Sequence, residues 1–231
     1  MNATLSPSVH EAMVKRHMSG DDDPAMLALH DAVKLAREMA TKAAQTADVV
    51  LRNTLETAPQ RHRKARAASF ELIERATKAL DDAVKTAQKE IATIRTRTKG
   101  PPPCKDLLTE TRQRELRERL AMLPDDRRKA IIADAIRNGD DLLVGAILNS
   151  PPWLTALGES ETALVRHNWA IKHFAGDLDR AERLQKALVD AERAGTLSIS
   201  FVDGLTDAQL IQQAETTERR AAEALAAAGK S

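Results

Sequence analysis

Small and apolar residues recur at spacings of three and four through two long segments of the N-terminal half, and this periodicity limits the fold more than any other feature. In residues 24–57 the series is Met26, Leu29, Val33, Ala36, Ala40, Ala43, Ala47 and Val50. In residues 61–97 it is Ile73, Ala76, Leu80, Ala83, Ala87, Ile91 and Ile94. This spacing places side chains on one face of a helix, and Pro59 interrupts the pattern between the two segments. We therefore predict a long antiparallel helical hairpin.

The composition sets the kind of packing that such a hairpin can have. Aromatic residues make up only 2% of the chain, and alanine is the most frequent residue on the predicted seams. Alanine seams let helices approach closely, but each alanine removes little apolar area from water. We expect the hairpin to need a further surface, either a partner or another copy of itself.

Gly100 and the three prolines that follow it mark the clearest boundary in the chain, because this run cannot continue a helix. We predict the all-α class: the hairpin, then a compact bundle of short helices, then an alanine-rich C-terminal helix. The expected divisions are a mobile N-terminal arm (1–23), the hairpin (24–98), a Pro-rich linker (99–104), a compact helical domain (105–204), and the C-terminal helix and tail (205–231). One short helix is the alternative to a mobile arm for residues 1–20.

Within residues 105–204, leucine and isoleucine replace alanine as the periodic residues. Helix signals are clearest at residues 124–139, where Pro124 and two aspartates open a helix and Gly139 closes it. Residues 141–150 are nearly all apolar, which predicts a buried helix. Two later glycines, Gly176 and Gly195, are predicted to end helices, and Thr206 is predicted to cap the last one.

Residues 197–202 alternate apolar and small residues in the way that a β-strand does. Because no partner strand is evident, an extended arm that pairs with another chain is the open alternative.

No residue pattern predicts catalysis, a metal site or a cofactor. The nine glycines form no phosphate-binding fingerprint, and the six histidines have no zinc-ligand spacing. Cys104, the single cysteine, is interpreted as an incidental thiol rather than a nucleophile. The run from Asp21 to Asp23 is interpreted as a helix cap rather than a cation site. We predict a non-enzymatic protein without a cofactor.

Two basic clusters are candidate phosphate contacts. They consist of Arg61, Arg63, Lys64 and Arg66 at the predicted hairpin tip, and of Arg95 and Arg97 beside the proline run. Stacking aromatics are missing near both, and the net charge is only +1. Nucleic-acid binding is therefore the less favoured interpretation.

The sequence SPPWLTALG, residues 150–158, interrupts the helical pattern with two prolines and a tryptophan. The favoured interpretation is a corner whose Trp153 fills the core of the small domain, with Trp169 packed nearby. The alternative is a partner contact formed by Trp153, Leu154 and Leu157, because tryptophan is enriched at interface hot spots.

The run DLLVGAILNSPPWLTALGESETALVR, Asp141 to Arg166, resembles uncharacterised helical proteins encoded among the structural genes of tailed bacteriophages. The resemblance covers about 26 residues, includes no catalytic motif, and implies a virion-associated or assembly protein.

The favoured function is therefore a structural or assembly protein that acts through protein partners, as a homo-oligomer or within a larger assembly. A nucleic-acid-associated helical regulator is the alternative. The N-terminus lacks the apolar stretch of a signal peptide, and no run is long enough to span a membrane. We expect synthesis in the cytoplasm, with incorporation into a virion as the implication of the resemblance.

Overall fold

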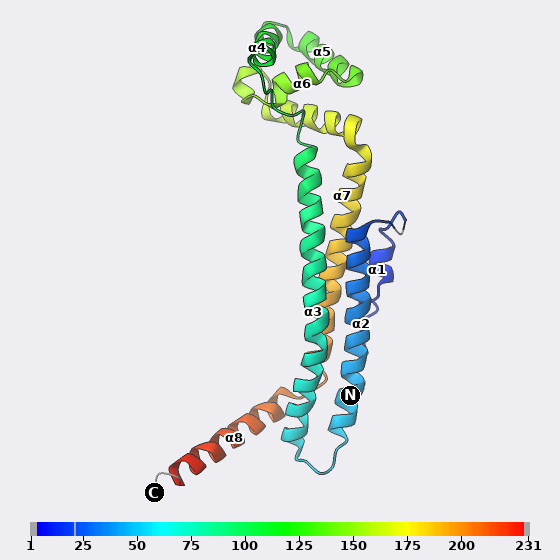
Figure 1. The fold of residues 1–231 in the computed structure, drawn as a ribbon, viewed down its shortest axis with the longest axis vertical. Coiled ribbons are helices and arrows are strands. Elements are labelled where there is room, and N and C mark those ends of the chain that lie inside the picture. The colour runs from blue at the N-terminus through cyan, green and yellow to red at the C-terminus, as the bar shows by residue number, and fades with distance from the viewer. Residues whose placement is uncertain (1–3, 21, 229–231) are drawn as a thin grey trace. The chain divides into compact units, whose positions relative to one another are not determined.

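A computed structural model describes residues 4–20 and 22–228 of the chain, and every regular element in them is helical (Figure 1). The elements are α1 (Ala12–Lys15), α2 (Pro24–Leu51), α3 (Ala58–Arg97), α4 (Leu107–Ala121), α5 (Asp125–Asn138), α6 (Asp141–Leu148), the 3₁₀ turn η1 (Pro152–Leu154), α7 (Glu159–Asp203) and α8 (Ala208–Ala228). The predicted all-α class is confirmed.

The chain forms two compact units whose boundaries differ from the predicted divisions. The first unit comprises residues 1–89 and 183–231, and the second comprises residues 90–182. Helices α3 and α7 each contribute to both units. The difference arises because the C-terminal part of α7 packs with the hairpin instead of remaining in the small domain.

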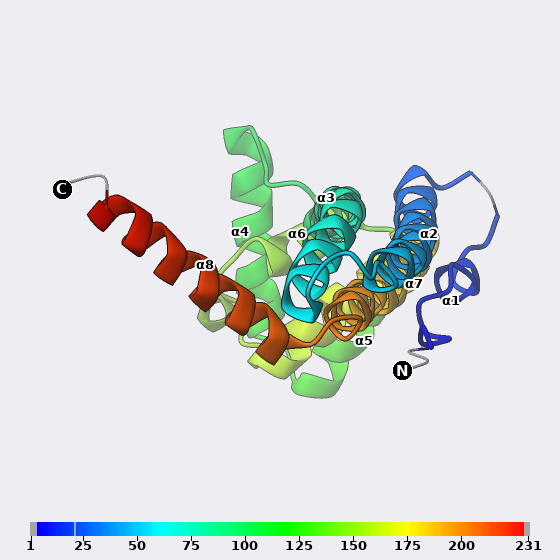
Figure 2. The ribbon, with the colours of Figure 1, turned by 90° about the horizontal axis from the view of Figure 1, so that it is seen from below.

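In the first unit, α2 and α3 run antiparallel, and the C-terminal part of α7 lies beside both (Figures 1 and 2). All predicted seam residues of the two hairpin helices are buried, except Val50, which is partly exposed. The buried residues of α7 here include Leu184, Ala187, Leu188, Ala191, Ala194, Ser198 and Val202. The chain thus supplies the additional surface that the alanine seams require.

The strand prediction for residues 197–202 is wrong, because this segment lies inside α7. Its buried residues, Ser198 and Val202, are four apart and continue the helical seam of Ala191 and Ala194. The hydroxyl of Ser198 donates to the carbonyl of Ala194 at 2.8 Å, so it needs no partner strand.

The predicted helix ends at Gly176 and Gly195 are also wrong, since both glycines lie within α7. The helix does change direction near the first of them, because Phe174 has the non-helical angles φ −139° and ψ 31°. Gly195 faces α3, where its missing side chain allows close approach of the two helices.

Residues 4–20 are packed and include the short helix α1, so the structure follows the short-helix alternative and not the mobile arm. Val9 and Val14 are fully buried, and α1 contacts α2. Of the acidic run, Asp21 lies outside the described residues. Asp23 caps α2 by accepting hydrogen bonds from the backbone of Ala25 and Met26, at 3.1 and 3.4 Å, as the cap interpretation predicted.

The second unit surrounds a core that α4, α5, α6 and the N-terminal part of α7 share. The buried members are Leu120, Ile132, Ala135, Leu143, Val144, Ile147, Leu157, Val165, Trp169 and Ala170. As predicted, α6 is mostly buried, and α5 ends at Gly139 in the left-handed conformation (φ 72°, ψ 36°) that favours glycine.

Helix α8 begins at Ala208, and Asp207 rather than Thr206 caps it by accepting from the backbone of Gln209 at 2.8 Å. Only Ile211 and Ala214 of this helix are buried. Residues 217–228 are all exposed.

Candidate functional site

Trp153 lies on the surface of the second unit, with 78% of the residue exposed. The prediction that it fills the core is therefore wrong. Trp169 occupies the core instead, with 4% exposed. The reason is the local geometry. Residues 152–154 form the turn η1, and the residues buried directly after it are Thr155 and Leu157, whereas Trp153 within the turn remains exposed.

Hydrogen bonds on both sides hold this turn in place. The backbone of Leu154 donates to the carbonyl of Pro151 at 3.0 Å, and the hydroxyl of Thr155 donates to the carbonyl of Pro152 at 2.8 Å. The prolines fix their own φ angles and so reduce the freedom of the turn. Trp153 is thus presented on a constrained backbone.

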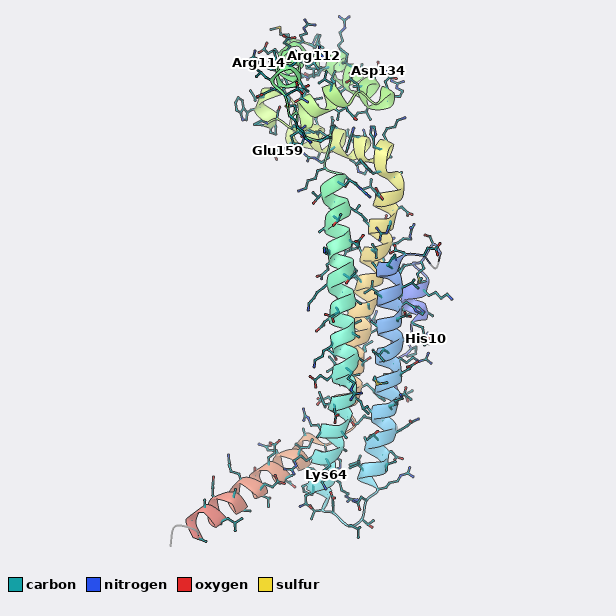
Figure 3. The ribbon with its side chains drawn as sticks, viewed as in Figure 1. His10, Lys64, Arg112, Arg114, Asp134 and Glu159 are labelled. Carbon is teal, nitrogen blue, oxygen red and sulfur yellow. The ribbon has the colours of Figure 1, made fainter. Side chains whose placement is uncertain are left out.

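Glu161 stabilises the start of α7 directly after the turn. Its carboxylate accepts a hydrogen bond from the backbone of Gly158 at 3.0 Å and pairs with Lys129 at 3.2 Å. The Gly158 hydrogen bond, followed by the interaction with Lys129, holds the pKa of the Glu161 carboxyl below its ordinary value of 4.5. This arrangement is one half of a capping box. Glu159, the first residue of α7, is labelled in Figure 3.

The three residues of the predicted partner contact therefore differ in accessibility. Trp153 is exposed, Leu154 is 39% exposed, and Leu157 belongs to the core. The accessible part of the contact is Trp153 and Leu154. An exposed indole with an apolar neighbour offers a large contact area and one hydrogen-bond donor.

The first basic cluster stabilises the connection between α2 and α3, where Figure 3 labels Lys64. Arg61 donates to the carbonyl of Leu51, the last residue of α2, at 2.8 Å. Lys64 pairs with Glu56 in the connecting loop. A cation at a helix C-terminus is favourable because the last carbonyls of the helix lack backbone partners.

The other two cations of this cluster pair with later elements of the same unit. Arg63 pairs with Glu218 of α8, and Arg66 pairs with Asp203 at 3.1 Å. Arg66 also lies over the ring of Phe70, 5.3 Å from its centroid. All four cations of the first cluster therefore make intramolecular interactions.

Arg97 of the second cluster pairs with Asp177 and lies over the ring of Phe174, 5.8 Å from its centroid. Arg95 is exposed on the same helix. These two arginines belong to the second unit, whereas the first cluster belongs to the first unit.

A feature that the sequence analysis missed is an open pocket of about 1010 Å³ in the second unit. One wall is a group of three aromatic rings. The ring centroids of Trp169 and His173 lie 4.9 Å apart, and those of Trp169 and Phe174 lie 5.4 Å apart. The indole Nε1 of Trp169 donates to Oδ1 of Asp141 at 2.9 Å. Asp141 and Trp169 are 28 positions apart in the sequence, so no local pattern could reveal this arrangement.

In the part of the chain that the structure describes, no group of three or more His, Cys, Asp or Glu side chains is placed to hold a metal ion. No helix in the same residues has the length and apolar character needed to cross a bilayer. Cys104 is free and partly exposed.

In comparisons with known proteins, no family model, no curated protein and no solved structure matches this chain significantly.

Proposed function

We propose that the protein is a non-enzymatic helical assembly protein that acts through protein–protein contacts, with a second copy of itself as the first partner. The observation that carries the proposal is the exposure of Trp153 on a constrained turn. Burying such a residue against another surface removes a large apolar area from water, and tryptophan is enriched among interface hot spots.

A second uncovered surface supports self-association. The apolar side of α8 continues beyond its buried residues through Ala221, Leu225 and Ala228, all of which are exposed. A short helix without packing is marginally stable in water, so it gains stability when another chain covers it. Its alanine-rich stripe resembles the seams of α2, α3 and α7, and a further copy of the chain offers helices of this kind.

The two surfaces belong to different units of one chain. Each copy could therefore contact more than one neighbour, which is the condition for assemblies larger than a dimer. Incorporation into a virion, which the sequence resemblance implies, is part of the proposal.

Light scattering over a concentration series, at low and moderate salt, tests the proposal. We expect a mass above the 25.3 kDa of one chain, with little dependence on salt because the contacts are apolar. Trp153→Ala and Leu225→Glu should each shift the mass towards the monomer. Val49→Ala is the matched control, since Val49 is an exposed apolar residue of α2 outside both surfaces.

A monomeric mass at every concentration would contradict self-association, and an equal effect of Val49→Ala would contradict the role of Trp153. Fluorescence adds a local measurement, because the chain has two tryptophans and no tyrosine. In the Trp169→Phe variant Trp153 is the only strong emitter, and acrylamide should quench it less as the protein concentration rises.

The alternative, a nucleic-acid-associated regulator, has weaker support because the cations of the first cluster already make intramolecular contacts. Its test is gel retardation in low salt with Arg61, Arg63, Lys64 and Arg66 changed to glutamine. Binding that falls steeply with salt and is lost in this variant would favour the alternative.

A further inference from the structure

The pocket of the second unit combines positively charged side chains with a backbone held in place, as anion-binding sites do. The proposed assembly function does not involve this pocket. Its walls come from the last turn of α3, the proline segment, the end of α6, and α7 near its bend at Phe174. The volume of about 1010 Å³ is large enough for a small organic ligand.

Two cations in the pocket wall have no acidic partner. Among the described residues, neither Lys99 nor Arg166 forms an ion pair, and both line the pocket. Nε of Arg166 donates to the backbone carbonyl of Lys99 at 3.0 Å, which fixes the guanidinium beside the lysine. That hydrogen bond does not involve the terminal nitrogens of the guanidinium, which are the groups that contact an oxyanion in pairs.

The negative charges near the pocket are already engaged. Among its described lining residues, Asp141 has the one carboxylate, and this accepts from Trp169 and lies 3.7 Å from Nε2 of His173. Asp177, outside the lining, neutralises Arg97. Neither carboxylate pairs with Lys99 or Arg166, so these two cations would attract an anionic ligand against the repulsion of Asp141.

The proline segment that carries Lys99 is held against α6. The side-chain amide of Asn149 donates to the carbonyls of Pro101 and Pro102, at 3.2 and 3.4 Å. A β-carbon at Gly100 would lie 3.1 Å from Cδ1 of Leu148, so the backbone approaches α6 too closely for a larger residue to fit without adjustment. A fixed backbone lowers the entropic cost of holding a ligand.

We propose that this pocket binds a phosphate group, which Arg166 holds through its terminal guanidinium nitrogens and Lys99 through its ammonium group. The planar, paired donors of arginine match the geometry of a phosphate, and lysine adds a compact charge. The phosphate can come from a nucleotide-sized small molecule or from a nucleic-acid strand.

Titration of the Trp153→Phe variant tests this site, because Trp169 in the pocket wall is then the only strong emitter. The probes are pyrophosphate, ATP and a single-stranded DNA octamer, each at about 0.1 M salt, where contacts between distant surface charges are screened. We expect saturable binding of at least one probe, seen in Trp169 fluorescence and by calorimetry. Saturation by pyrophosphate or ATP identifies a small ligand, whereas saturation by the octamer alone identifies a nucleic-acid strand.

Charge-removing variants distinguish the site from general attraction. Lys99→Met and Arg166→Gln, made in the same background, should each weaken binding by about tenfold or more, in line with the loss of a charge-assisted hydrogen bond. Arg112→Gln is the matched control, since Arg112 is an exposed cation of α4 outside the pocket lining (Figure 3). Circular dichroism checks that each variant is folded.

Three results would overturn the proposal. The first is that no probe binds saturably at concentrations up to about 10 mM, where even weak ligands would saturate the site. The second is that neither Lys99→Met nor Arg166→Gln weakens binding. The third is that Arg112→Gln weakens binding as much as the two pocket variants do.

Discussion

Gly195 of α7 packs against Leu80 of α3 so closely that a β-carbon at residue 195 would overlap Cδ2 of the leucine. Leu80 is itself buried. A glycine in a helix interior is less favourable than alanine by about 1 kcal/mol. The close approach of α7 to the hairpin explains why a glycine is nevertheless present in the middle of a long helix.

Replacing Gly195 with alanine should lower the free energy of unfolding by about 1 kcal/mol. Overpacking a buried contact costs about 1–3 kcal/mol, and this exceeds the gain in helix propensity of about 1 kcal/mol. Urea unfolding followed by circular dichroism measures the difference.

Gly176→Ala is the matched control, because nothing lies within 4 Å of a β-carbon added there. It should stabilise the protein by about 0.5–1 kcal/mol. In a Leu80→Ala background, Gly195→Ala should become neutral or stabilising. If Gly195→Ala stabilises the original chain as much as Gly176→Ala does, the Leu80 side chain yields to the added β-carbon at little cost, and the close contact does not account for the glycine.

The hairpin could be predicted from sequence because its seams repeat at helical spacing over many turns, from Met26 to Ala47 and from Ile73 to Ile94. The continuation of α7 beyond Gly195 could not be predicted, for two reasons. Residues 197–202 alternate by chance with a period of two, and Gly195 resembles a helix stop. Both signals are local, whereas the packing of Gly195 on Leu80 joins residues more than a hundred positions apart.

Sites were harder to predict than helices. Trp153 was expected in the core because tryptophans are usually well buried, but its neighbours Thr155 and Leu157 anchor the turn instead. The charges of the basic clusters were evident from sequence, but their intramolecular partners, such as Glu218 for Arg63, come from distant segments. The aromatic pocket wall depends in the same way on the contact of Asp141 with Trp169.

Asp190 attaches the N-terminal segment to α7, and its replacement with asparagine should weaken this attachment. Oδ2 of Asp190 accepts from Arg16 at 2.8 Å and lies 2.8 Å from Nε2 of His17. Burial raises the pKa of the Asp190 carboxyl, but hydrogen bonds from His17 and Arg16 outweigh it, and the pKa lies below the ordinary 3.8. Hydrogen bonds to a charged group contribute about 1–3 kcal/mol, so the loss at neutral pH should be of that order.

The direction of the pKa change gives the pH dependence. Because the carboxyl is more acidic in the folded state, its stabilisation is fully present above the unfolded pKa of about 4 and is lost as the pH falls through the lower, folded value. Asp190→Asn should therefore lose less stability than the original chain on acidification below pH about 4. Hydrogen exchange of residues 4–20 reports on the attachment directly.

Asp48→Asn is the control, because Asp48 forms an exposed pair with Arg52 on the helix surface, worth no more than about 0.5 kcal/mol. Equal protection of residues 4–20 in Asp190→Asn and Asp48→Asn would show that Asp190 does not hold the segment.

Asp141 accepts a hydrogen bond from the buried Trp169 and also places a negative charge in the pocket wall. Replacing it with alanine or with asparagine separates these two roles. Asp141→Ala leaves the indole N–H of Trp169 without its acceptor, which should cost about 1–3 kcal/mol of stability. Asp141→Asn can still accept that hydrogen bond through its amide oxygen, so its cost should be under about 1 kcal/mol. Thermal unfolding and the emission of Trp169 in the Trp153→Phe background measure both effects.

The same pair of variants bears on the pocket, because Asp141→Asn removes a negative charge from its wall without removing the hydrogen bond. If Lys99 and Arg166 hold a phosphate there, Asp141→Asn should bind the probe more tightly than the original chain, since repulsion between the carboxylate and the anion is gone. Weaker binding by a stably folded Asp141→Asn would show instead that the carboxylate takes part in recognition, and the ligand would have to carry a donor or a positive charge.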